Sequence, residues 1–121
     1  MPDDRGSVPG HVSECDDVYG ILELVRLRPG MWVRQGSVQE LSTMLFGYSL
    51  ALQVHSVPER FDLHPALGPF ADWLRATRGW SMVFGWATAI EENAGDSTPL
   101  DLFFSLLDEY RARPGSGQQA G

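Results

Sequence analysis

Apolar residues through the middle of the chain recur at intervals of three and four positions, a spacing that places them on one face of an α-helix. The clearest segment opens with a capping box, Ser37-Val-Gln-Glu40, in which each polar side chain is expected to accept the exposed backbone N–H of the other residue. One apolar stripe runs through positions 38–52. A second stripe on the same segment comprises Phe46, Leu50 and Val54. Two stripes predict a central helix that the other helices cover, ending before Pro58.

Four more helices are predicted from the same spacing and from residues that favour helix ends. The first covers about residues 15–27, with Ser13 as its N-cap and Pro29-Gly30 as its stop. The remaining three are a helix that opens at Pro69 and closes at Gly79, one over residues 81–94, and one that opens at Pro99 after the cap Thr98. In the helix that opens at Pro99, Leu100 and Phe103 are expected to face inward.

The junction after the first helix, Arg28-Pro29-Gly30-Met31, is predicted to be a bend between two helices. Gly30 is expected to have a positive φ or to lie where a Cβ atom would clash. Met31 and Trp32 are expected to pack this turn onto the core.

No segment alternates apolar and polar residues with a period of two, as a half-buried strand would. The predicted fold class is therefore all-α, a compact bundle of about five helices around a central hydrophobic helix. A chain of 121 residues with 43% hydrophobic residues suits one globular domain. We expect the helical domain over residues 13–112, with disordered polar tails at 1–12 and 113–121.

The net charge of −7 argues against nucleic acid as the main partner, because phosphate binding needs a basic patch. No run approaches the ~18 apolar residues of a membrane span, and the acidic start of the chain is unlike a signal peptide. Cys15 is the single cysteine, so an internal disulfide is excluded and a reducing compartment is favoured. These features together predict a cytoplasmic protein without membrane contact.

The acidic residues are unevenly distributed. No basic residue occurs between Arg78 and Arg111, so we expect an acidic face that steers a basic protein partner toward the chain. Tryptophans at segment junctions are expected to be partly exposed there, whereas Trp73 and Trp86, like Val83, fall on core stripes. The candidate partner-binding residues are Glu91, Glu92, Asp96, Asp101, Asp108, Glu109, Trp32 and Trp80.

Three patterns suggest chemistry but have a simpler structural interpretation. Gly47-Tyr-Ser49-Leu-Ala51 is similar to a nucleophile elbow, yet it lies inside a helical pattern without a sheet to strain the serine. The cysteine and histidines have no metal-ligand spacing, and adjacent carboxylates such as Glu91-Glu92 point about 100° apart on a helix. The sequence therefore predicts no catalytic, cofactor-binding or metal-binding residues and no enzymatic activity.

Residues 24–33, LVRLRPGMWV, resemble a string in the ATP-binding domain of gyrase B-type ATPases. That family carries a catalytic Glu and a magnesium-binding Asn on the next helix, followed later by an Asp-x-Gly-x-Gly motif. Here the middle of the next helix reads Met-Leu-Phe-Gly-Tyr, and the later motif is absent. The string is therefore interpreted as a turn and ATP binding is not expected.

Residues 15–112 as a whole resemble a group of small, uncharacterised bacterial helical proteins. The shared features are an RPGM-W/Y turn, a GY.AL central helix, a helix with Trp73, and a closing LFF.LLDE.R at 102–111. Some small acidic bacterial proteins of this kind are immunity proteins for secreted toxins. The resemblance implies a protein-interaction module that binds a basic partner, such as a toxin. The alternative hypothesis is a small-molecule-binding or enzyme accessory domain with an aromatic pocket.

Overall fold

The computed structural model describes residues 11–114 and confirms the all-α class, with five α-helices. No strand occurs between residues 11 and 114. The predicted tails, 1–12 and 113–121, lie mostly outside the described residues. The elements in chain order are η1 (Val12–Glu14), α1 (Val18–Leu27), η2 (Pro29–Met31), η3 (Arg34–Gly36), α2 (Val38–Val54), α3 (Pro69–Arg78), α4 (Gly85–Asn93) and α5 (Pro99–Ala112), where η marks a 3-10 turn.

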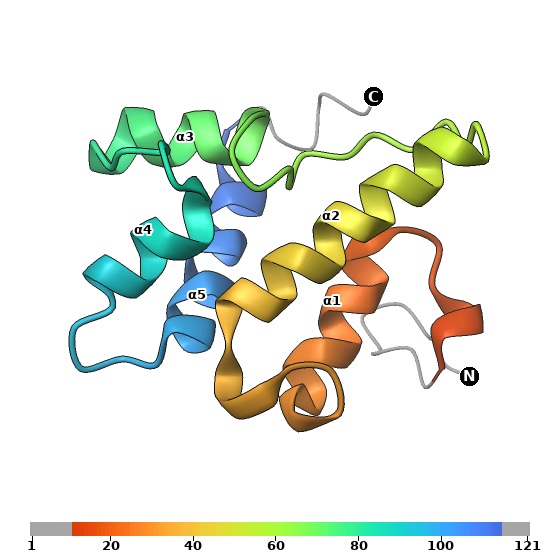
Figure 1. Cartoon of the computed structure of the whole chain (residues 1–121), viewed down its shortest axis with the longest axis horizontal. Coiled ribbons are helices and arrows are strands. Elements are labelled where there is room, and N and C mark those ends of the chain that lie inside the picture. The colour runs from red at the N-terminus through yellow and green to blue at the C-terminus, as the bar shows by residue number, and fades with distance from the viewer. Residues whose placement is uncertain (1–10, 115–121) are drawn as a thin grey trace.

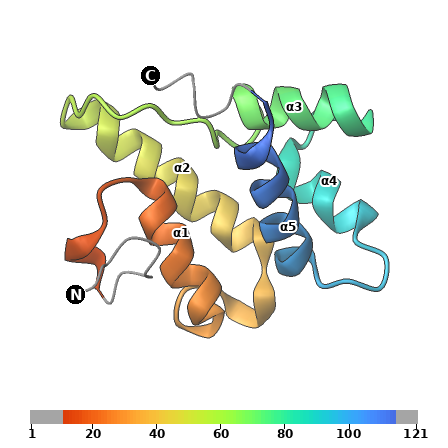
Figure 2. The same cartoon turned by 180° about the vertical axis from the view of Figure 1, so that it is seen from behind.

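The helices pack around one core, and α2 crosses the middle of the molecule (Figure 1). Seen from behind, α1 and α5 lie on the other side of α2, and α4 stands next to α5 (Figure 2). Aromatic rings hold α3, α4 and α5 together. The ring of Phe70 lies 5.8, 6.0 and 5.3 Å from those of Trp86, Phe103 and Tyr110, each in an edge-to-face arrangement.

The outer side of α2 differs from the prediction. In its first stripe Val38, Leu41 and Leu45 are buried, as expected, and the other members are partly buried. The second stripe, Phe46, Leu50 and Val54, is exposed, so the prediction that other helices cover α2 on both sides is wrong. The neighbouring helices all pack on the inner side of α2, and the outer side carries apolar residues that face solvent.

Two helices begin later than predicted. Asp17, rather than Ser13, is the N-cap of α1, because its Oδ1 accepts the backbone N–H groups of Tyr19 and Gly20 over 3.0 and 3.2 Å. The predicted start of the fourth helix at residue 81 is also wrong. Gly85 has φ +87° and packs against Pro65, whose carbonyl oxygen would lie 3.0 Å from an added Cβ, so the helix begins only at Gly85.

The start of α2 confirms half of the predicted capping box. The Ser37 hydroxyl oxygen accepts the Glu40 N–H over 3.1 Å. The Glu40 carboxylate does not return the contact to Ser37 but accepts the Arg34 N–H over 2.8 Å. It thus fixes the turn that precedes the helix. The start of α5 is as predicted, with the Thr98 hydroxyl oxygen accepting the Asp101 N–H over 3.2 Å.

The bend between α1 and α2 is present but does not depend on Gly30. Gly30 has no positive φ, and a Cβ atom added there would have no neighbour within 4 Å, so both reasons proposed for this glycine are wrong. The left-handed conformations fall instead on Gln35 and Gly36, with φ +51° and +69°. Trp32 packs against the core as predicted, but Met31 is 73% exposed.

The connection between α2 and α3 is held by two acidic side chains. The Glu59 carboxylate accepts the Val18 N–H at the start of α1 over 2.9 Å and the Tyr48 hydroxyl of α2 over 2.5 Å. The buried Asp62 carboxylate accepts the Tyr110 hydroxyl over 2.7 Å. The connection is therefore fixed to three helices and lies beside α2 (Figure 1).

Candidate protein interface

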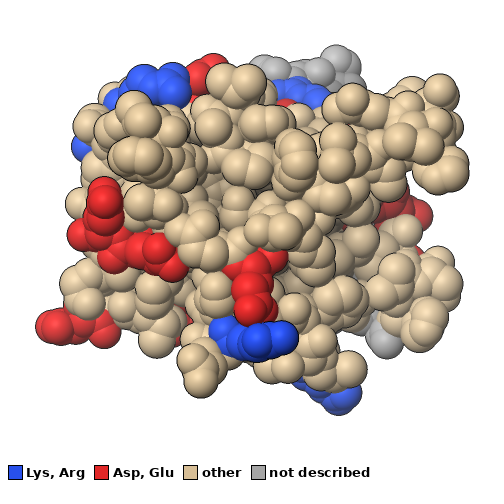
Figure 3. Space-filling view, in the orientation of Figure 1, with Lys and Arg blue, Asp and Glu red and all other residues tan. Residues whose placement is uncertain are grey.

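Four of the six predicted acidic residues lie close together along the chain at one corner. Glu91 and Glu92 lie in the last turn of α4, Asp96 lies in the connection to α5, and Asp101 is in the first turn of α5. All four are exposed. Figure 3 shows acidic atoms at the left edge, over α4 and its connection to α5. We call these four residues the acidic corner.

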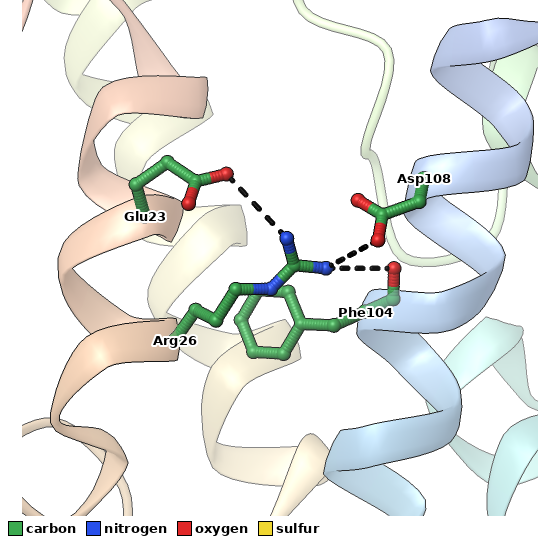
Figure 4. Close-up of polar contacts among 4 residues, drawn as sticks. All are labelled: Glu23, Arg26, Phe104 and Asp108. Carbon is green, nitrogen blue, oxygen red and sulfur yellow. Dashed lines mark hydrogen bonds and ion pairs between the residues drawn. The ribbon is translucent and has the colours of Figure 1, made fainter. Parts of the chain in front are cut away.

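The other two predicted acidic residues are neutralised within the molecule. Asp108 accepts a hydrogen bond from Arg26 of α1 over 2.8 Å, and Figure 4 shows this arginine extending from α1 across the Phe104 ring to α5. Glu109 forms an ion pair with Arg78 of α3 over 2.8 Å. Asp108 and Glu109 therefore contribute much less to an acidic field than the sequence suggested.

The acidic corner itself is poorly compensated. Glu91 accepts a hydrogen bond from the Gln39 side chain over 3.0 Å, whereas the other three carboxylates have no hydrogen bond or ion pair with any residue in 11–114. The last turn of α4 contains no basic residue. Glu91 and Glu92 lie in this turn, at the negative end of the helix dipole, which disfavours their negative charges. Asp101, in the first turn of α5, instead lies at the favourable end.

A second surface feature lies on the same face of the molecule. Large apolar side chains are exposed along the outer side of α2 and on the two segments next to it. Val83 and Phe84, which immediately precede α4, are 76% and 78% exposed, although Val83 had been predicted to face the core. We call this set the apolar face; it comprises Phe46, Leu50, Val54, Leu67, Val83 and Phe84.

Contacts through the connection 55–68 bring the parts of the apolar face together. The Phe46 ring meets the His64 ring edge-on, with centroids 5.8 Å apart. The carbonyl oxygen of the next residue, Pro65, accepts the backbone N–H of Trp86 over 2.8 Å, and Pro65 also packs on Gly85. Residues 83 and 84 are therefore held beside the connection. In Figure 3, the upper middle of this view is uncharged, and charged atoms lie at its left and upper edges and below its centre.

The predicted division of the tryptophans is confirmed for Trp86 but not for Trp73, which is half-buried like Trp32 and Trp80. Trp86 is fully buried, and its indole N–H donates to the Leu63 and His64 carbonyl oxygens over 3.3 and 3.1 Å. Trp73 is only half-buried, so its assignment to the core is correct in direction but too strong. Trp32 and Trp80 are half-buried at their junctions. Neither belongs to the acidic corner or the apolar face as defined.

The residues suggestive of chemistry have structural roles. The buried Ser49 hydroxyl donates to the Phe46 carbonyl oxygen of the preceding helical turn over 2.7 Å. The His64 Nδ1 atom accepts the N–H groups of Ala66 and Leu67, both over 3.1 Å. Burial, together with the nearby Asp17 carboxylate, raises the pKa of the Cys15 thiol, which disfavours its reactive thiolate form.

The described part of the chain, residues 11–114, offers no group of three or more metal-ligating side chains in one place. Among the same residues, every helix is too short or too polar to cross a bilayer. Comparison with known proteins adds no family: no family model, curated protein or solved structure matches the chain. The resemblance to small bacterial helical proteins stays a prediction.

Sequence reasoning missed one part of this surface and the contacts that fix the connection beside it. The exposure of Phe84 had no signal in the helical pattern, because residues 81–84 continue the apolar spacing of α4 without joining the helix. The role of Glu59 and Asp62 was also missed. Two carboxylates in a connection rich in Pro and His were the available signal, but their partners are 41 and 48 positions away, at Val18 and Tyr110.

Proposed function

We propose that the chain is a non-enzymatic module that binds another protein through the apolar face and the acidic corner together. The observation that supports this most strongly is the pair Val83 and Phe84, both more than three-quarters exposed. Folding of the single chain gains little from side chains left in water. Grouped exposed apolar residues on a protein surface usually mark a contact with a partner.

The acidic corner defines the chemistry of that partner. Because Glu92, Asp96 and Asp101 have no ion-pair partner among residues 11–114, their charge is available to an approaching molecule. A basic surface is attracted to such a group, which raises the association rate and makes it sensitive to salt. The partner that fits both features is a protein with apolar anchor residues flanked by Arg or Lys.

A toxin with a basic surface is the specific partner that we propose, so that the chain acts as an immunity protein. A nuclease toxin suits this role best, because the surface that binds nucleic-acid phosphates is basic and the acidic corner has the complementary charge. The proposed setting is the cytoplasm, where the single free thiol of Cys15 would remain reduced. The proposal includes neither nucleic acid nor membrane as a partner.

The test is quantitative affinity capture from the native host with matched single substitutions of the bait. Glu92→Lys alters the acidic corner and Phe84→Ser alters the apolar face. Asp16→Lys is the charge control, because Asp16 is also exposed and without a hydrogen bond or ion pair among residues 11–114, but lies before α1. We expect one captured protein to be retained by wild type and Asp16→Lys and lost with both other variants.

The purified partner then allows the association rate to be measured from 50 mM to 500 mM NaCl, spanning Debye lengths from above about 10 Å to below about 8 Å. The rate should fall with salt for wild type and depend less on salt for Glu92→Lys. A captured set that is the same for all four baits, or a rate that is independent of salt, would contradict the proposal.

A further inference from the structure

A separate cavity of about 370 Å³ lies where α1 meets the turn η2. Its volume falls in the range of small-molecule sites, roughly 300–1,000 Å³. The apolar part of its lining consists of Val12, Leu24, Leu27, Met31 and Trp32. None of these residues belongs to the apolar face or the acidic corner.

The polar side chains of the lining are His11 and Arg28, and Arg28 is the one with a permanent positive charge. Arg28 is exposed and has no hydrogen bond or ion pair with any residue in 11–114. Each of the other arginines in that range has a partner. Arg26, Arg34, Arg60, Arg75 and Arg78 pair with carboxylates, and Arg111 and Arg113 lie 4.0 and 3.8 Å from tyrosine ring centres.

The absence of a carboxylate near Arg28 has a chemical consequence. The described residues that line the cavity include no Asp or Glu, so none of them competes for the guanidinium group. A guanidinium forms short, charge-assisted hydrogen bonds with carboxylates in a two-pronged geometry. An anion that reaches this position therefore meets an exposed guanidinium group that has no partner among residues 11–114, beside an apolar wall.

The wall on the Arg28 side is also fixed in shape. The Met31 N–H donates to the Arg28 carbonyl oxygen over 3.0 Å, and the Trp32 N–H donates to that of Pro29 over 2.9 Å. The ring of Pro29 restricts the backbone at the same turn. A cavity whose wall is already ordered loses little conformational entropy when a ligand enters it.

We propose that this cavity binds a small amphiphilic carboxylate, with an apolar chain or ring against Leu24, Met31 and Trp32 and the carboxylate on Arg28. The ligand is a free molecule in solution rather than a lipid in a bilayer. The proposal does not depend on the proposed protein interface, since the two surfaces share no residue and either test can fail alone.

The test follows amide signals by NMR while octanoate, and separately octanol, is added to the full chain. Octanoate and octanol share an apolar chain and differ in charge. For wild type, we expect the signals of residues 24–32 to shift and to saturate with octanoate. Arg28→Gln should weaken octanoate binding at least tenfold and leave octanol binding unchanged, because it removes only the carboxylate partner.

Two further variants test this result independently. Met31→Glu changes an exposed side chain of the wall and should weaken octanoate binding more than octanol binding, because it adds a negative charge. Arg75→Gln removes an arginine from α3 and should leave both unchanged. Shifts that do not saturate, shifts centred away from residues 24–32, or equal losses for octanoate and octanol in Arg28→Gln would overturn the proposal. Co-sedimentation with phosphatidylglycerol vesicles without octanoate binding would overturn it in favour of a lipid surface.

Discussion

The hydroxyl group of Tyr110 donates a 2.7 Å hydrogen bond to the carboxylate of Asp62, and both residues are buried. This contact joins the connection after α2 to the last helix. The other carboxylate oxygen accepts the Arg60 Nε–H over 2.9 Å, so Asp62 is satisfied on both sides. One partner, Arg60, is a sequence neighbour of Asp62, and the other, Tyr110, lies 48 positions away.

Removing that hydroxyl should destabilise the fold. Tyr110→Phe keeps the ring in the aromatic core but leaves a buried carboxylate oxygen without its donor, which we expect to cost about 1–3 kcal/mol in the free energy of unfolding. Urea unfolding followed by circular dichroism gives the value. Tyr19→Phe is the matched control, because the Tyr19 hydroxyl has no hydrogen bond with residues 11–114, and it should change stability by less than about 0.5 kcal/mol. Equal effects of the two substitutions would contradict this role.

Alkaline pH should weaken the same contact. Burial, and next the hydrogen bond to Asp62, raise the pKa of Tyr110 well above its usual value. Burial and Glu59 do the same for the pKa of Tyr48. In the unfolded chain these phenols lose their protons near pH ~10. Above that pH the folded state holds more protons than the unfolded state, so stability is full below about pH 10 and falls as pH rises further.

The change in the free energy of unfolding with pH provides the test. Each tyrosine that stays protonated only in the folded state lowers stability by up to about 1.4 kcal/mol per pH unit. Urea unfolding at pH 8, 10 and 11 should show this fall for wild type and a shallower fall for Tyr110→Phe. If the two proteins lose stability in parallel between pH 10 and pH 11, the Tyr110 phenol is not responsible.

The contrast between local and distant contacts explains how much of the fold was predictable. The Ser37 and Thr98 caps were predictable because each depends on residues within one helical turn. The start of α4 at Gly85 was not, because it depends on contact with the carbonyl group of Pro65. The apolar spacing of residues 81–84 continues that of α4, so periodicity alone could not show that these residues precede the helix.

The candidate interface was predictable to a smaller extent for the same reason. The sequence shows that basic residues are absent between Arg78 and Arg111, but not that α1 and α3 supply them from elsewhere. Arg26 reaches Asp108 across 82 positions, and Arg78 reaches Glu109 across 31. A one-dimensional charge pattern therefore overstates an acidic face whenever helices that are distant in sequence pack against it.

The turn between α1 and α2 yields a prediction opposite to the one from sequence. At Gly30 an added Cβ meets nothing within 4 Å and φ is not positive, so Gly30→Ala should be neutral or stabilise the fold by up to about 1 kcal/mol. At Gly36, with φ +69°, the same substitution should cost about 1 kcal/mol or more, although its Cβ would have room. Urea unfolding of both variants checks the pair. A larger loss at Gly30 than at Gly36 would restore the original interpretation of the bend.

The acidic corner should show opposite effects on stability at its two ends. Glu92 lies in the last turn of α4, where the helix dipole disfavours a negative charge, and Asp101 lies in the first turn of α5, where the dipole favours one. At low ionic strength Glu92→Lys should therefore stabilise the isolated chain by about 0.3–1 kcal/mol, and Asp101→Lys should destabilise it by a similar amount.

Both substitutions should nevertheless weaken binding to a basic partner, since each replaces one negative charge by a positive charge. Stability and binding thus separate at Glu92. If Glu92→Lys folds more stably than wild type yet binds less well, the wild-type carboxylate serves contact with the partner rather than folding. Thermal unfolding at 10 mM and 500 mM NaCl supplies the stability measurement. The differences between the variants should shrink at the higher concentration, where charges are screened within about 5 Å. Loss of stability in Glu92→Lys at low salt would show that this carboxylate supports the fold, and its effect on binding would then say nothing about a partner.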